Sequence, residues 1–303
     1  MPAVDLLAGR TAAVVILLPA LGVLAAVAQV VRHGVTAFEL GLLGVMYVLT
    51  LVGVEVGFHR LIAHRGLSAP AAVRLVLAAL GSMTAQGPIV WWVTMHRRHH
   101  EDSDAAQDPH SPHRIGGRAT GGWRGFVHAH IGWMWSVHRQ QSDSGRYVRD
   151  ILRDPVLVFA QRSYFAWVAA GLLLPGLLGW WWLGGVQGAG RGVLWGGLVR
   201  LFLVHQAMWC VASVCHLFGS RPYRTPGDDR SRNNAWVAIV TLGEGWHNNH
   251  HAFPSSARHG LEWWQVDVNY CLIRLLSVLG LARDVRVPNS AARATRRATE
   301  KAA

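Results

Sequence analysis

The stretch TAAVVILLPALGVLAAVAQVV, residues 11–31, contains no charged side chain. Its length matches the roughly 20 apolar residues that a helix needs to cross the hydrocarbon core of a bilayer. Three similar stretches follow at residues 35–57, 165–186 and 192–214. The chain is therefore predicted to be an all-α integral membrane protein with four transmembrane helices, the second of which carries Glu39 and Glu55.

Two other apolar features are interpreted differently. Residues 70–92 contain Arg74, Gln86 and Pro88, so we expect a buried or re-entrant segment there and not a full span. The first apolar stretch is too long for the core of a secretory signal, and we expect it to be retained as a helix.

The basic side chains lie on one side of the predicted spans. The net charge of the 303 residues is +12, and the two short loops on the opposite side hold only Arg32 and Arg191. The positive-inside rule then predicts a cytosolic helical cap built from residues 59–164 and 216–285. The basic tail, residues 286–303, is expected to be solvated or to touch lipid. We expect a single domain over residues 1–303. Because the charge flanks the spans, we exclude nucleic acid as a partner.

Histidines cluster where the spans meet the predicted cap. HRLIAH (59–64) follows the second span, HRRHH (96–100) follows residues 70–92, and GEGWHNNHH (243–251) lies beyond the fourth span. In the last two clusters the spacing i, i+3, i+4 places three imidazoles on one helix face. With the histidine that ends the fourth span, the candidate metal ligands are His59, His64, His96, His99, His100, His216, His247, His250 and His251.

This concentration of imidazoles indicates metal binding. Neutral imidazole suits Fe, Zn, Cu and Ni, and it binds through one nitrogen while the other nitrogen needs an acceptor. We expect Glu55, Asp108, Glu244 and Asn248 to be such acceptors. Without a metal, clustered imidazoles would lower one another's pKa values and contribute little stability.

The number of candidate ligands favours two ions over one. The HExxH pattern of zinc proteases is absent. Two redox metals at a membrane face indicate oxygen chemistry on a lipid-like substrate, because histidines alone cannot attack a methylene C–H bond. Isolated histidines, including His205 and His259, are interpreted as ordinary polar groups.

The motifs resemble those of the membrane-bound fatty acid desaturases, specifically the stearoyl-CoA (acyl-CoA delta-9) type, in a bacterial-like form. The resemblance covers about residues 35–285 and rests on GFHRLIAHR, HRRHH, DPHSPH, HIGW, VCHLFGSRPY and GEGWHNNHHAFP in the family's order. It implies that the nine histidines hold two irons beneath a cytosolic helical cap. It also implies a bent acyl tunnel, with Gln86, Trp92 and Trp209 lining the bend.

The same resemblance implies the reaction and its partners. Two hydrogens would leave a saturated acyl chain, CoA- or lipid-linked, while O2 is reduced to water. Electrons would come from a separate ferredoxin or cytochrome b5-like protein with a reductase, because no haem or flavin motif is visible here. We expect the enzyme in a bacterial plasma membrane, with its site on the cytosolic face.

The chain departs from the family pattern in three respects. Ala212 replaces the usual Asn before the fourth-span histidine, and Glu55 replaces the usual Thr four residues before the first histidine. An ionisable group inside a span is a functional hypothesis by default, so this carboxylate is expected to orient His59 or to replace the missing Asn as a ligand. A hydrogen-bonded core glutamate is the alternative. Thr94–Met95 and Met208 also differ from the animal enzymes, which leaves the acyl carrier open.

Two other functions are compatible with parts of this pattern. A lipid hydroxylase or ketolase could use the same di-iron scaffold. A metal-binding membrane transporter would need polar groups near the bilayer midplane, and only Glu55, Arg200 and His205 qualify.

Overall fold

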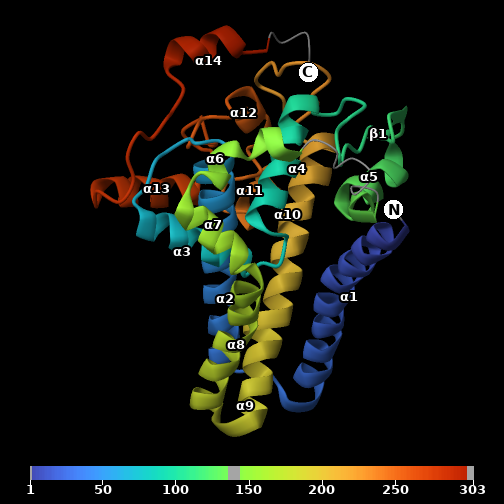
Figure 1. Ribbon diagram of the computed structural model, residues 1–303, viewed down its shortest axis with the longest axis vertical. Coiled ribbons are helices and arrows are strands. Elements are labelled where there is room, and N and C mark those ends of the chain that lie inside the picture. The colour runs from blue at the N-terminus through green and yellow to red at the C-terminus, as the bar shows by residue number, and fades with distance from the viewer. Residues whose placement is uncertain (1, 136–143, 299–303) are drawn as a thin grey trace.

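The computed structural model describes residues 2–135 and 144–298, and most of them are helical. Long helices form a bundle, and the shorter elements gather at one of its ends (Figure 1). The helices are α1 (Pro2–His33), α2 (Ala37–Val52), π-helix η1 (Gly53–Ala63), α3 (Ala71–Ser82), α4 (Ile89–Asp102), α5 (Gly122–His130), η2 (Gly132–Trp135), η4 (Ser144–Tyr147), α6 (Arg149–Leu152), α7 (Pro155–Arg162), α8 (Tyr164–Gly179), η5 (Trp180–Gly184), α9 (Gly185–Gly192), η6 (Val193–Val199), α10 (Arg200–Leu217), α11 (Ala235–Val240), α12 (His247–Ala252), α13 (Val268–Val278) and α14 (Ser290–Arg296).

Three helical stretches among the described residues are long and apolar enough to cross a membrane, which indicates a membrane protein: Gly9–His33, Ala37–Ala63 and Tyr164–Leu217. The third stretch folds back on itself where Gly184 and Gly185 adopt positive φ angles of 85° and 60°. Glycine accepts this conformation without steric cost. The turn lies inside the predicted third span, a few residues earlier than the loop expected from the sequence.

Small residues let the two arms of this hairpin approach closely. A Cβ atom at Gly179 would lie 2.2 Å from the carbonyl oxygen of Gly188, and one at Gly192 would lie 2.1 Å from that of Pro175. Only glycine fits such contacts, as at other tight helix crossings in membranes.

Glu39 has a structural role at the far end of the bundle. It forms a capping box with Thr36 at the start of α2, and its carboxylate is fully buried. The Arg191 guanidinium in α9 donates to both carboxylate oxygens, at 2.7 and 2.6 Å. The acidic residue in the predicted span therefore joins α2 to the hairpin.

Residues 70–92 form two helices with a break between them, and neither lies along a full span. α3 packs against η1, where a Cβ at Gly53 would meet the Gly81 nitrogen at 2.2 Å. The carbonyls left free by the break are satisfied from α10. Arg200 donates to Met83 O at 2.7 Å, and His205 Nε2 lies 2.6 Å from Thr84 O. Two of the three polar groups that a transporter would need thus serve the broken backbone.

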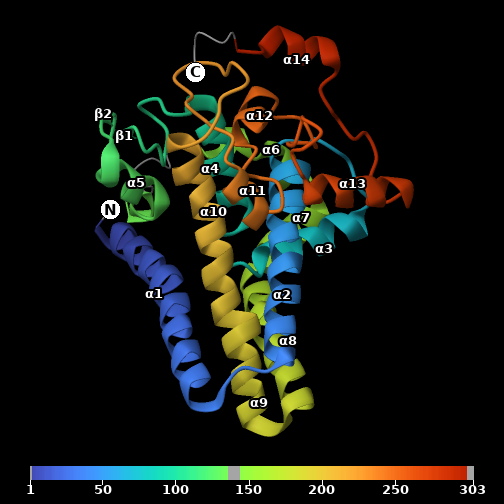
Figure 2. The ribbon, with the colours of Figure 1, turned by 180° about the vertical axis from the view of Figure 1, so that it is seen from behind.

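The other elements cover the end of the bundle that carries the histidines (Figure 2). The strands β1 (Arg114–Ile115) and β2 (Arg118–Ala119), of two residues each, pair as a short antiparallel hairpin. A large hydrophobic core joins η1, α3, α4, α7 and α13. These contacts fix the elements from which the histidines project.

The basic tail is mostly exposed, and its arginines bond to the rest of the chain. Residues 290–296 form α14, and Arg293 and Arg297 donate to Glu262 at 3.0 and 2.7 Å. Arg296 donates to the carbonyl of Ala252, at the end of α12. The tail therefore packs over the histidine-bearing helix, because its arginines find acceptors there.

Replacing Arg191 by Gln should lower the free energy of unfolding by about 2 kcal/mol or more, because it leaves the buried Glu39 carboxylate without its cation. The thermal midpoint of the purified protein in detergent measures this change. Arg32→Gln, in the last turn of α1, is the matched control. Equal thermal midpoints for the two variants would contradict the role of Arg191 as the partner of Glu39.

Candidate metal centre

The nine predicted histidines lie together in two groups. Ring nitrogens of the first group, and likewise those of the second, all lie within 4.8 Å of one another. The first group consists of His59, His64, His96, His100 and His250; the second of His99, His216, His247 and His251. Facing Nε2 atoms are as close as 2.6 Å in the first group, between His64 and His96, and 3.1 Å in the second, between His216 and His247.

The two short histidine clusters are each divided between the groups. α4 gives His96 and His100, four residues apart, to the first group and His99 to the second. α12 does the reverse, giving its pair four residues apart to the second group and His250 to the first. Residues i and i+4 stack on one helix face, whereas i+3 is displaced around the axis. The i, i+3, i+4 spacing was expected to place three ligands in one site. Instead, each of these helices contributes ligands to both groups.

A π-helix brings His59 and His64 to the same group. Five residues correspond to about 140° around an α-helix, which would separate the two rings. Here α2 continues as η1, and the backbone N–H of His64 donates to the carbonyl of His59 at 3.0 Å, an i+5 hydrogen bond. The ring centroids are 4.9 Å apart. The wider turn explains the spacing of HRLIAH, as π-helical turns often do at functional sites.

In the second group, three rings have their Nδ1, the nitrogen that points away from the other rings, bonded to a carboxylate. His99 Nδ1 lies 3.0 Å from Asp108, and His216 Nδ1 lies 2.8 Å from Asp104. His251 Nδ1 bonds to Asp229. A carboxylate behind an imidazole fixes its tautomer and ring orientation, and such partners stand behind most histidines that bind metals.

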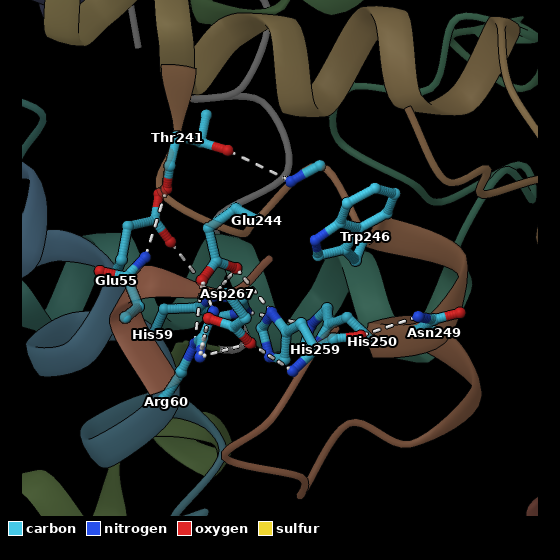
Figure 3. Close-up of polar contacts among 12 residues, drawn as sticks. Glu55, His59, Arg60, Thr241, Glu244, Trp246, Asn249, His250, His259 and Asp267 are labelled. Atoms are coloured by element: carbon cyan, nitrogen blue, oxygen red, sulfur yellow. Dashed lines mark hydrogen bonds and ion pairs between the residues drawn. The ribbon is translucent and has the colours of Figure 1, made fainter. Parts of the chain in front are cut away.

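In the first group, Glu244 is the carboxylate beside Nδ1 of His59 (Figure 3). Its Oε2 lies 2.8 Å from His59 Nδ1 and 3.0 Å from His259 Nδ1. Its Oε1 accepts from the fully buried Arg60 at 2.6 Å, and Arg60 also donates to Asp267 at 2.9 Å. A buried charge is tolerated when it is paired in this way.

Burial favours the neutral form of several of these imidazoles. It lowers the pKa values of the His64, His96 and His100 rings well below their usual range, and neighbouring histidines add to the effect. For Asp108, burial alone would raise the pKa, but the adjacent His99 lowers it to about 2. Likewise, Arg60 outweighs burial and holds the pKa of Glu244 well below its ordinary value. Neutral imidazole backed by an ionised carboxylate is the form that binds a metal ion.

The donor set fits a cation in each group. An Nδ1 that donates to a carboxylate leaves the Nε2 of the same ring with a lone pair and no proton. In the second group three rings have their Nδ1 beside a carboxylate, and the Nε2 atoms of His99 and His251 are buried without a hydrogen-bond partner. Several lone pairs directed at one point repel one another unless a positive ion lies between them.

The acceptors only partly match their prediction. Asp108, Glu244 and Glu55 lie beside ring nitrogens, Glu55 Oε2 being 3.6 Å from His59 Nδ1. Asn248 differs, because both ends of its amide bond to the backbone of Tyr223, at 2.9 and 3.0 Å. It ties α12 to the preceding loop.

Four participants were not identified from the sequence: Asp104, Asp229, His110 and His259. Asp104 and Asp229 lie in polar loops where nothing local marks a partner of a distant ring. His259 was interpreted as an ordinary polar group, yet it is fully buried, and its ring centroid lies 4.4 Å from that of His250. In the sequence, only His110 stands near a predicted acceptor, because it shares a proline-containing loop with Asp108.

A mostly apolar cavity of about 750 Å³ leads to both groups. Such a volume is typical of small-molecule sites. The predicted tunnel residues Gln86, Trp92 and Trp209 all line it, as do Glu55 and Ala212. His59 and His96 of the first group, and His99 and His247 of the second, form part of its wall.

The chain is similar to known proteins over most of its length. The family described as fatty acid desaturase matches residues 36–268. The chain is 43% identical over 275 residues to a hex-5-enoyl-[acyl-carrier protein] acetylenase of Moorena producens, covering 90% of this chain and 84% of that protein. It is 40% identical over 258 residues to an sn-1 stearoyl-lipid 9-desaturase of Synechocystis (84% and 74% covered). It is 39% identical over 241 residues to an acyl-CoA C20 Delta5-desaturase of Anemone leveillei (78% and 70% covered).

Replacing Asp229 by Asn should weaken metal binding by about ten- to a hundredfold, because the amide no longer accepts strongly from His251 Nδ1. Titration of the apoprotein with ferrous iron against a chelator measures the affinity. Asp228→Asn is the matched control, since that neighbouring side chain is 57% exposed and pairs with Arg114. If Asp229→Asn bound ferrous iron as tightly as the wild type, Asp229 would have no role in metal binding.

Proposed function

We propose, because the chain belongs to the fatty acid desaturase family, that this oxidoreductase converts a –CH2–CH2– unit of a saturated acyl chain into –CH=CH–. The observation that carries the proposal is the pair of histidine groups in the wall of a mostly apolar cavity. The balanced reaction consumes the acyl chain, O2, two electrons and two protons, and it yields the alkene and two water molecules. A separate ferredoxin or cytochrome b5-like protein with a reductase would supply the electrons.

Two iron ions are the proposed cofactor, one for each histidine group. Zinc would suit the nitrogen donors equally well, but it has no redox chemistry. When bound, the irons would supply the activation of O2 that removes hydrogens from an unactivated methylene.

The residues of the chain position the substrate and the cofactor. The cavity walls would hold the acyl chain against the histidine groups and exclude water from the reacting carbons. The ring of Trp92 stacks on that of His96, with centroids 5.0 Å apart, so the same side chain touches the cavity and the centre. Asp104, Asp108, Asp229 and Glu244 would keep the imidazole lone pairs directed inward.

The proposed orientation in the membrane uses the long apolar helices and the distribution of arginines. Helices α1 and α2–η1, together with the two arms of the 164–217 hairpin, would provide four crossings of a bacterial plasma membrane. The arginine-rich elements that surround the histidines would form a cap on the cytosolic side, which supports the positive-inside expectation. The electron donor would then reach the centre from the cytosol.

Incubation of the iron-loaded protein with a stearoyl substrate, O2 and a reducing system should give a product two mass units lighter than the substrate. Mass spectrometry of the acyl chains measures this directly. Addition of one oxygen atom instead would identify a hydroxylase, and an unchanged chain with two irons bound would refute both oxidations. His216→Ala, which removes a ring of the second group, should abolish this product. His33→Ala, at the exposed end of α1, is the matched control and should retain it.

Glu55 is proposed as a positioning residue for His59. Its carboxylate is fully buried and lies on the outer side of the His59 ring, with Oε2 3.6 Å from His59 Nδ1. This place favours orientation of the ring over direct replacement of the missing Asn as a ligand, since the nitrogens of the first group meet at the opposite edge of the ring.

Glu55→Gln should therefore retain two irons and an unchanged KM while kcat falls by about tenfold, because an amide orients His59 less strongly. The Mössbauer parameters of the iron should shift in the same variant, which a purely structural role would not cause. Glu101→Gln on the exposed surface is the control. Wild-type kcat and spectrum for Glu55→Gln would rule out this role.

A further inference from the structure

The cavity is open on the side of the bundle. Three of its lining side chains are largely exposed: Val14 is 60%, Leu18 45% and Phe165 81% accessible. The first two belong to α1 and the third to α8, and all three lie in the apolar stretches expected to contact lipid. The opening between α1 and α8 therefore faces the hydrocarbon region and not the aqueous phase.

The packing of α1 explains this opening. Near its start, Gly9 lies against Trp135 of η2, and farther along, Gly22 packs tightly on Leu198 of η6. Trp195 Nε1 also donates to Gln29 at 2.6 Å. α1 diverges from α10 towards its N-terminal end (Figures 1 and 2), and residues between 10 and 19 line the cavity. The span between the attachments is about 20 Å long at 1.5 Å per residue.

A cation marks the outer edge of the same opening. Arg10 lines the cavity and is exposed, and it lies one helical turn before Val14 at the end of α1 nearest the histidines. An arginine at the end of an apolar span lies at the level of the lipid headgroups, where it attracts phosphate. The opening thus combines an apolar side for an acyl chain with a positive rim for an anionic headgroup.

We propose that the acyl chain enters sideways from the bilayer while it is still esterified to a glycerophospholipid, whose phosphate stays near Arg10. This inference rests on the proposed desaturase function and adds the substrate class. A phospholipid chain that moves through an apolar side opening never has to leave hydrocarbon, whereas a CoA or carrier-protein thioester arrives from water. The relatives act on lipid-linked, CoA-linked and carrier-protein-linked chains, so family membership alone does not choose among them.

The test uses the full chain, loaded with iron, in vesicles of stearoyl-containing phosphatidylcholine with a ferredoxin reducing system. Stearoyl-CoA and stearoyl-carrier protein are supplied in separate arms with vesicles that lack stearoyl chains. The double bond is expected in the phospholipid, at a rate at least tenfold above either thioester. Faster turnover of a thioester would overturn the proposal but leave the desaturase function intact, whereas no product in any arm would overturn the function itself.

Variants at the opening test the route. Val14→Trp and Leu18→Trp should each reduce phospholipid turnover at least fivefold by narrowing the opening. Leu17→Trp, also exposed at 58% but not lining the cavity, should retain the wild-type rate. Iron content and thermal midpoint confirm that each variant is folded. Arg10→Gln should raise KM for the phospholipid with little change in kcat. Unchanged kinetics in all three opening variants would exclude this route.

Discussion

The constraint on which the structure depends is the removal of nine imidazoles from water around two points. A ring that keeps one nitrogen for the centre can give its other nitrogen to an acceptor. His99, His216 and His251 do this through Asp108, Asp104 and Asp229. These carboxylates also accept hydrogen bonds within their own loops, as Asp108 does from the backbone of Asp104 and His110, so the loops and the centre support each other.

The Arg60–Glu244–Asp267 network extends this order through the rest of the site. One guanidinium, fully buried, joins η1 to the segment before α12 and to the residue that caps α13. Glu244 divides its two oxygens between that cation and the rings of His59 and His259. Breaking a buried pair of this kind leaves an uncompensated charge, so the network fixes the positions of elements that are distant in the sequence.

The membrane-facing helices and the centre are parts of one unit. α10 supplies His216 to the second group, and one turn earlier it supplies Ala212 to the cavity wall. Arg200 and His205, on the same helix, satisfy the carbonyls of the break between α3 and α4. Polar residues in an apolar helix thus support the irregular backbone beside the cavity, where lipid could not hydrogen-bond to it.

The sequence by itself determined the apolar stretches, the nine histidines and their relation to the desaturases, because hydropathy and short spacings are local properties. Only the tertiary structure decided how the ligands divide. The i, i+3, i+4 spacing does not reveal that α4 and α12 each serve both groups, and the five-residue spacing of His59 and His64 makes sense only on a π-helix. Asp104 and His216 are 112 positions apart, and no local pattern connects them. A buried ring and its acceptor are selected by the packing of distant elements, which becomes defined only when the chain is folded.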